Sequence, residues 1–183
     1  MVMTHYMELL AANQPWNLLM FMALPVILAE TIAITELYLL YRRKFSGRVR
    51  TINRIAGIAS GVVFAAIILY LLPNAVVPIT AGGEWRTFID VFAVLVYLLS
   101  GVPLILVALQ DLGLIQRKLS DEKKLGWHVS YIAAFLVLGH LAMIAGMTDP
   151  TIFGYDGAAT HGEVHSEIQT PLPSQVVSPH SGH

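Results

Sequence analysis

The run FIDVFAVLVYLLSGVPLILVALQ, Phe88–Gln110, decides the fold because it is long and predominantly apolar. A helix needs roughly 20 residues to cross the hydrocarbon core of a bilayer, and this run supplies them. Three further runs are long enough to span as helices: Leu18–Tyr41, Ile55–Leu72 and Trp127–Met147. Residues of the AVILMFWYC group make up 56% of the chain, and charged residues make up 13%. The sequence therefore predicts an all-α integral membrane protein, with a bundle of four transmembrane helices in residues 1–147.

Two short basic segments give the expected topology. Ten of the eleven Lys and Arg residues lie in Arg42–Arg54 and Arg117–Lys124, and Arg86 lies alone in another gap. Short loops rich in Lys and Arg stay on the cytoplasmic side of a membrane. We therefore expect a bacterial inner membrane protein with both termini outside the cytoplasm and the lipid bilayer as its main partner. Tryptophans fall at the ends of the spans, as in an aromatic belt: Trp16, Trp85 and Trp127.

Little of the chain remains for a soluble domain. Residues 148–183 are rich in Gly, Ser, Pro, Thr and His, so a flexible, disordered extracytoplasmic tail is expected. Met1–Asn13 has a weak helical pattern that could lie flat on the outer surface. The outer loop contains residues that are expected to break any helix: Pro73, Pro78, Gly82 and Gly83.

Composition also excludes some chemistry. Without cysteine there is no disulfide, thiolate ligand, iron–sulfur cluster or cysteine nucleophile. The net charge of −1 gives no basic surface for nucleic acid. No nucleophile elbow or HExxH motif is present, so no catalytic residue is assigned and the pattern favours a non-enzyme.

Two glutamates on the first predicted helix are candidates for handling a proton or a cation. Glu30 lies near the middle of the helix, and Glu36 lies about two turns nearer the cytoplasm. A carboxylate at the centre of a span costs about 2.5–3.5 kcal/mol on insertion scales, so such groups usually face the bundle and mark function. No Lys or Arg lies inside the predicted spans to pair with them. The two glutamates are six residues apart, which places their carboxylates about 120° apart around the helix. One shared site is therefore not expected.

By depth, Glu30 is expected near Ser60, Ser100 and Tyr97. By the same count, Glu36 is expected near Ser130, Tyr131 and His128. The alternative interpretation of Glu30 is a protonated carboxyl that hydrogen-bonds to neighbouring helices. Glu36 lies closer to the inner interface, and its alternative interpretation is a side chain that extends to that interface. His128, next to Trp127, is interpreted as an interfacial anchor.

A stripe on the fourth helix suggests a metal. His140, Met143 and Met147 are related as i, i+3 and i+7, which places them on one face. Thioether and imidazole ligands together suit Cu(I), and copper or another transition metal is the expected cofactor. Further Met and His residues lie in the outer half of the first helix or in the N-terminal segment: Met3, His5, Met7, Met20 and Met22. Flexible packing in an apolar core explains the methionines equally well.

The tail adds a second candidate metal site. His161 and His165 are four residues apart and would share one face if the segment became helical, as in i, i+4 metal pairs. A composition with a few histidines also occurs in tails that bind no metal, so this signal is compositional only.

Backbone features shape the predicted bundle. Pro25 and Pro103 each remove a hydrogen bond within a helix, which frees the carbonyls of Phe21 and Leu99. Freed carbonyls can line a cavity or a cation path. Gly57-x3-Gly61 favours close helix packing, either within the bundle or with a second subunit.

Short strings in the first quarter of the chain carry a family resemblance. These strings resemble the start of uncharacterised bacterial four-helix membrane proteins sometimes labelled permease. They are Asn13-Gln14-Pro15-Trp16-Asn17, Pro25, Ala29-Glu30-Thr31 and Thr35-Glu36-Leu37. The resemblance implies transport and names no substrate.

Three functions therefore remain open. The first is a small permease-like or metal-handling membrane protein, which predicts a homodimer or a partner membrane subunit because four helices rarely enclose a transport path. The second is a structural or accessory subunit of a larger membrane complex. The third is a b-type cytochrome-like electron-transfer subunit, which is less favoured because haem needs two axial ligands and only His140 is deeply placed.

Overall fold

A computed structural model describes residues 4–43 and 46–154, and the regular structure within these ranges is helical. The elements follow one another as α1 (His5–Ala11), α2 (Trp16–Leu18), η1 (Leu19–Ala23), α3 (Leu24–Arg42), α4 (Arg48–Leu71), η2 (Leu72–Val76), α5 (Val77–Gly82), α6 (Phe88–Asp111), α7 (Asp121–Met147) and η3 (Pro150–Phe153). The segments η1 and η2 are π-helical turns, and η3 is a 3-10 helix.

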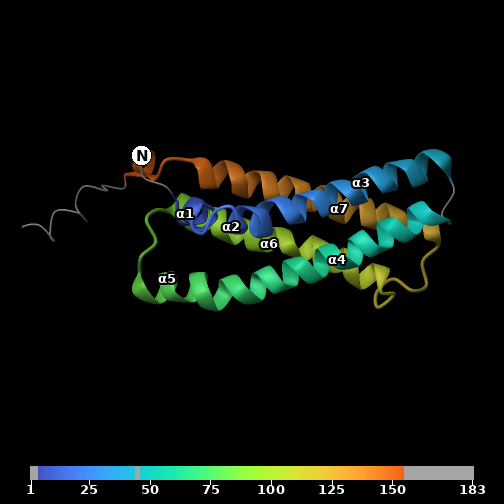
Figure 1. Cartoon of the computed structure of the whole chain (residues 1–183), viewed down its shortest axis with the longest axis horizontal. Helices are drawn as coiled ribbons and strands as arrows, with labels where there is room; N and C mark the ends of the chain where they lie inside the picture. Colours follow the sequence, from blue (N-terminus) through green and yellow to red (C-terminus); the bar gives the residue numbers. More distant parts are fainter. Residues whose placement is uncertain (1–3, 44–45, 155–183) are drawn as a thin grey trace, which may run out of the picture.

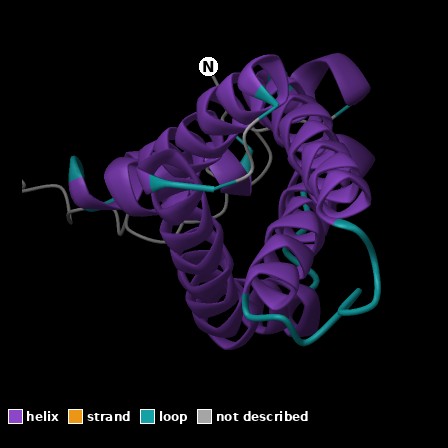
Figure 2. Ribbon diagram, turned by 90° about the vertical axis from the view of Figure 1, so that its right-hand side faces the viewer, coloured by secondary structure: helices purple, strands orange, loops and turns teal. Residues whose placement is uncertain are grey.

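Four helical stretches of the described chain are long and apolar enough to cross a membrane, namely Trp16–Arg42, Arg48–Gly82, Phe88–Asp111 and Asp121–Met147. They lie side by side as a bundle (Figure 1), and the view turned by 90° shows no strand or sheet (Figure 2). The predicted four-helix membrane bundle is confirmed. The chain is a multi-pass membrane protein.

The bundle has two different ends. The connections from α3 to α4 and from α6 to α7 lie together at one end, on the right of Figure 1. We call this the basic end, because Arg42–Arg54 and Arg117–Lys124 flank it. The opposite end carries α1, α5 and η3, and we call it the terminal end.

The expected helix breaks at Pro73 and Pro78 are wrong. The π-helical turn η2 carries the chain past Pro73, and the Val77 N–H donates to the Leu72 carbonyl. Pro78 is the second residue of α5, which continues directly from η2. The second span therefore continues to Gly82. It ends at Gly83, whose φ of +64° suits a residue without a side chain.

The N-terminal segment packs against the bundle. Tyr6 and Leu10 of α1 are buried against the terminal end of the bundle. The Thr4 hydroxyl donates to the Gly146 carbonyl at 2.5 Å. The His5 N–H donates to Asp90 Oδ1 at 2.8 Å. These contacts with α6 and α7 seat α1 as a cover over this end of the bundle.

The close-packing motif on α4 acts within the chain. A side chain at Gly61 would collide with Ala108 and approach the Leu104 carbonyl to 2.9 Å, and one at Gly57 would collide with the Asp111 carboxylate. Only glycine lets the α4 and α6 backbones come this close. Of the two predicted uses of the motif, packing within the bundle is therefore the one that the structure shows.

Candidate functional site

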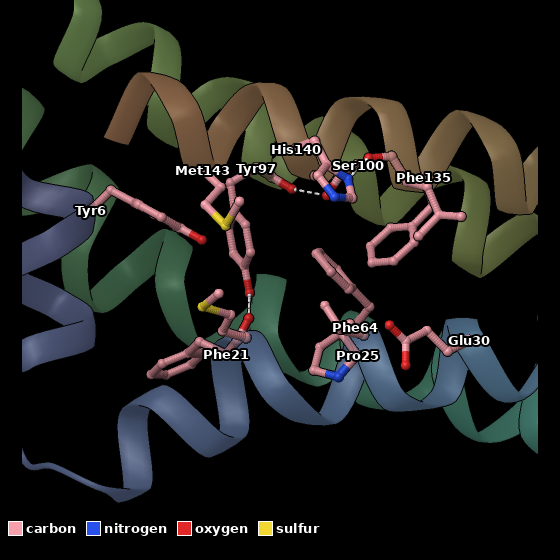
Figure 3. Close-up of a pocket in the computed structure, with 14 residues that line it drawn as sticks. Tyr6, Phe21, Pro25, Glu30, Phe64, Tyr97, Ser100, Phe135, His140 and Met143 are labelled. Carbon is pink, nitrogen blue, oxygen red and sulfur yellow. Dashed lines mark hydrogen bonds between the residues drawn. The ribbon is translucent and has the colours of Figure 1, made fainter. Parts of the chain in front are cut away.

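A cavity of about 270 Å³ lies inside the half of the bundle nearer the terminal end. Most of its wall is apolar or aromatic, and its lining draws on α1, η1, α3, α4, α6 and α7. Figure 3 shows the side chains that converge on it. The polar and sulfur-containing lining residues are Tyr6, Met22, Glu30, Tyr97, Ser100, His140 and Met143.

The cavity opens between α3 and α7. Glu30 on α3 and His140 on α7 both line it and are both exposed, whereas Phe64, Tyr97 and Ser100 at its back are buried. The residue patterns could not show whether Glu30 and His140 belong together, and the structure assigns both to one cavity. Its opening toward the side of the bundle would meet lipid in a membrane.

The Glu30 carboxylate has no protein partner in the described part of the chain, where no hydrogen bond or ion pair involves it. The depth prediction for this residue is confirmed for Tyr97 and Ser100, which line the same cavity. A carboxylate at this depth is costly when it is unpaired. It therefore needs a proton or a cationic ligand.

Two tyrosines fix the shape of the cavity. The Tyr97 hydroxyl donates to the Phe21 carbonyl at 2.5 Å, and that carbonyl is the one that Pro25 was expected to free. Tyr6 reaches the cavity from α1 and packs over Gly146. Burial raises the pKa of Tyr6 to about 12, so its phenol stays neutral at physiological pH.

The methionine stripe is split by the fold. His140 and Met143 line the cavity, but Met147 is 62% exposed and does not line it. The reason is that Tyr6 closes the cavity at Gly146. Met22 of η1 comes to the cavity instead, so one imidazole and two thioethers share its wall.

The orientation of His140 leaves one ring nitrogen available. Its Nδ1 donates to the Leu136 carbonyl at 2.6 Å, so Nε2 is the atom left to accept a proton or a metal ion. Among the described residues, no group of three or more His, Cys, Asp or Glu side chains could hold a metal ion. A metal in the cavity would therefore need the methionine sulfurs.

His5 does not join this set. Its Nδ1 lies 2.5 Å from Asp90 Oδ2, and it does not line the cavity. His161 and His165 lie outside the described residues. Asp90 was not among the sequence candidates, although it is buried and ties α1 to α6.

A second group of charged side chains is buried at the basic end. His128 on α7 is 0% exposed and lies between two carboxylates from other helices. Its Nδ1 is hydrogen-bonded to Glu36 Oε1 on α3, and its Nε2 lies 2.9 Å from Asp111 Oδ2 on α6. Arg50 Nη2 on α4 lies 3.6 Å from Asp111 Oδ1. We call Glu36, Arg50, Asp111 and His128 the basic-end cluster.

Neutral polar groups and a second arginine support this cluster. Asn53 is buried, and its Nδ2 donates to Thr35 Oγ1 at 2.9 Å. Arg50 Nη1 donates to Asn53 Oδ1 at 2.9 Å. Arg54 Nε donates to the Asp111 carbonyl at 2.9 Å, which caps the end of α6. All four long helices therefore contribute to one polar network.

Two expectations about this region are wrong. His128 is not an interfacial anchor, because it is fully buried between Glu36 and Asp111. Arginine is present within a spanning helix, because α4 begins at Arg48, seven residues before the predicted start at Ile55. A span predicted from hydropathy ends where the apolar residues end. The helix itself is held by backbone hydrogen bonds, which continue into the polar interface.

The expected separation of the two glutamates is confirmed. Glu30 lines the cavity, and Glu36 pairs with His128 in the basic-end cluster. Asp111 was missed because it lies one residue beyond the predicted end of the third helix. The only signal in the sequence was its position beside a basic loop.

The described part of the chain offers no second free histidine for an axial pair on haem. Both nitrogens of His128 face carboxylates, and His5 pairs with Asp90. His140 is the remaining described histidine, and its candidate neighbours in the cavity are sulfurs.

Comparison with known proteins identifies a family but no activity. The family model DUF6803, described as a family of unknown function, matches residues 1–162. The chain belongs to this family. The matched range includes α1, all four spans, the cavity and the basic-end cluster. No curated protein and no solved structure matches the chain.

Proposed function

We propose that this membrane protein is a small permease whose ligand enters the cavity between α3 and α7. The observation that supports this most is the Glu30 carboxylate, which lines the cavity of a membrane-spanning bundle and has no partner among the described residues. Ionisable groups that face the interior of a membrane bundle commonly mark substrate or ion pathways. The first-quarter resemblance to proteins labelled permease agrees with this proposal.

The lining favours a small organic cation. Phe21, Phe64, Phe135 and Tyr97 present aromatic surface to the cavity, and Glu30 presents the carboxylate. Aromatic faces attract ammonium groups, and this attraction grows when water is excluded. A hydrophobic ligand with one positive charge would satisfy both the wall and the carboxylate.

The topology proposed for the permease follows from its basic end. This end faces the cytoplasm of a bacterial inner membrane, because Lys and Arg in short loops are retained there. Both termini then lie outside the cytoplasm. Since the cavity opens at the side of four helices, a second copy or a partner subunit completes the path.

Replacing Glu30 by glutamine tests the carboxylate. We expect the E30Q protein in liposomes to bind benzyltrimethylammonium at least tenfold more weakly than the native protein, a loss of about 1.4 kcal/mol or more. Uptake of this probe into the vesicles should fall in parallel. The measurement is equilibrium binding and vesicle uptake of the labelled probe.

The matched control is neopentylbenzene, which has the shape of the probe but carries no charge. Its binding should be the same in the native and E30Q proteins. Equal binding of the cation to both proteins would contradict the role of Glu30. A native protein that neither binds nor takes up the cation would favour the structural or accessory subunit instead.

A soft metal ion is the second candidate ligand. His140, Met143 and Met22 line the same cavity, and no described residue contacts Nε2 of His140 through a hydrogen bond. Imidazole with thioether sulfur suits Cu(I) better than it suits harder ions. A permease with this ligand would handle copper, with Glu30 carrying a proton or the ion further.

Metal content tests this candidate directly. Protein purified from its native membrane, without an affinity tag or added metal, should contain copper at close to one ion per chain. Replacing His140 by alanine should remove it, whereas replacing the exposed Met147 by leucine should not. Protein without copper, or copper that persists in H140A, would contradict the candidate.

A further inference from the structure

We propose that Glu36, His128 and Asp111 form a buried proton-binding site, and that release of its proton separates α3 from α6 and α7 at the basic end. This inference does not depend on which ligand enters the cavity. Only its use in coupling proton movement to transport rests on the proposed function.

The hydrogen-bond geometry requires a shared proton. Each ring nitrogen of His128 faces a carboxylate oxygen, and a carboxylate without a proton can only accept. A neutral imidazole has a single N–H and can therefore donate to only one of the two. The second contact needs one more proton, either on the ring or on one of the carboxyl groups.

The charge balance gives the same answer. With that proton bound, two carboxylates face one imidazolium and the Arg50 guanidinium, so the basic-end cluster has no net charge. Without it, one negative charge remains among side chains of which Glu36, Asp111 and His128 are buried. Buried charge without compensation is strongly unfavourable. The closed arrangement is therefore the protonated one.

The surrounding charges do not replace the proton. Among the described acidic residues, Arg50 and Arg54 on α4 contact Asp111 and not Glu36, and Arg54 contacts only the backbone carbonyl of Asp111. Lys124 on α7 places its Nζ 3.9 Å from Asp121, one of the exposed acids of the first turn. No cation therefore faces Glu36 except His128 among the described residues.

The position of the basic-end cluster between α3 and α7 couples proton release to a movement of these helices. α3 contacts α7 through Glu36 and His128 at the basic end, whereas the cavity separates the same two helices nearer the terminal end. Losing the proton leaves a nitrogen lone pair of His128 opposite a carboxylate, so that two acceptors face each other. The two helices then part at the basic end, and the gap leads toward the cavity.

Spin labels on the full chain in phosphatidylcholine nanodiscs test the inference. The chain has no cysteine, so pairs of introduced cysteines are the only labelled sites. The basic-end pair is Y41C with K123C, on exposed positions of α3 and α7. The terminal-end pair is F88C with I144C, on exposed positions of α6 and α7.

We expect the basic-end distance to lengthen as pH rises from about 5 to about 10, a range in which Lys and Arg stay mostly charged. The terminal-end distance should stay constant. In E36Q, the glutamine amide donates to one nitrogen of His128 while the other donates to Asp111, so no extra proton is needed. The basic-end distance in E36Q should therefore stay short at every pH.

The matched control is E122Q, which makes the same chemical change at an exposed position of the same end. It should keep the full pH response of the native chain. A native basic-end distance that does not change with pH would overturn the proposal, even if E36Q failed to fold. So would an E36Q response equal to the native one, or a lengthening of both distances together.

Discussion

Replacing His128 by alanine is expected to lower the free energy of unfolding by about 3–5 kcal/mol, as for other buried ion pairs that lose one partner. The imidazole is fully buried and is the only described partner of the Glu36 carboxylate. Its removal leaves Glu36 without a hydrogen bond and leaves Asp111 with Arg50 at 3.6 Å. Unfolding in mixed micelles with increasing dodecyl sulfate, followed by circular dichroism, measures the loss.

The matched control is H140A, which removes the same side chain from an exposed position of the same helix. In metal-free protein it should change the free energy of unfolding by less than about 0.5 kcal/mol. Replacing Glu36, Asp111 and His128 together by apolar residues of similar volume should restore most of the stability. A stable H128A protein would show that the basic-end cluster holds no uncompensated charge.

Replacing Gly61 by alanine is expected to lower the free energy of unfolding by about 1–3 kcal/mol, the usual cost of overpacking. The added methyl group would collide with Ala108 and approach the Leu104 carbonyl to 2.9 Å, and neither backbone nor β-carbon can move independently of its helix. α4 and α6 must therefore separate. The same unfolding measurement in mixed micelles detects this change.

The control for this prediction is a glycine-to-alanine change that is expected to raise the free energy of unfolding. G126A adds the same methyl group at a helical position of α7 where a β-carbon would meet nothing within 4 Å. Alanine is favoured over glycine in a helix by roughly 0.5–1 kcal/mol, so this variant should be more stable than the native chain. Equal losses in both variants would mean that glycine matters for flexibility and not for close packing.

The sequence located the spans better than it located their ends. Each predicted span lies within an observed helical stretch, because roughly 20 apolar residues are needed and few segments qualify. The ends extend further than predicted. α4 begins at Arg48 and its helical path continues past Pro73, because π-helical turns absorb a proline that an ideal α-helix would not.

The candidate site was predicted in part. Glu30, His140 and Met143 were singled out as ionisable or metal-ligating groups inside spans, and they line one cavity. Met147 was grouped with them by its spacing and His5 by its predicted position on the outer side, and the fold places both outside that cavity. Helical periodicity correctly places Met147 on the same face of α7 as His140 and Met143. It does not show that α1 closes the cavity before Met147 is reached.

The pairing of His128 with two carboxylates was the main omission. Depth counting brought His128 near Glu36, but its neighbour Trp127 favoured an interfacial interpretation. Asp111 lay outside the predicted helix altogether. To predict that a histidine pairs with two carboxylates, one must know how three helices are rotated about their axes. No local pattern in the sequence contains that information.

Local sequence patterns are enough to predict four membrane-spanning helices, and to place Glu30 and Glu36 in different sites. Both follow from local quantities, the length of an apolar run and the angle between residues on one helix. The tertiary structure adds that His128 lies between Glu36 and Asp111, and that Glu30 shares a cavity with His140. These contacts depend on how close and at what rotation the helices pack, and that is set by side-chain fit between them, as at Gly57 and Gly61.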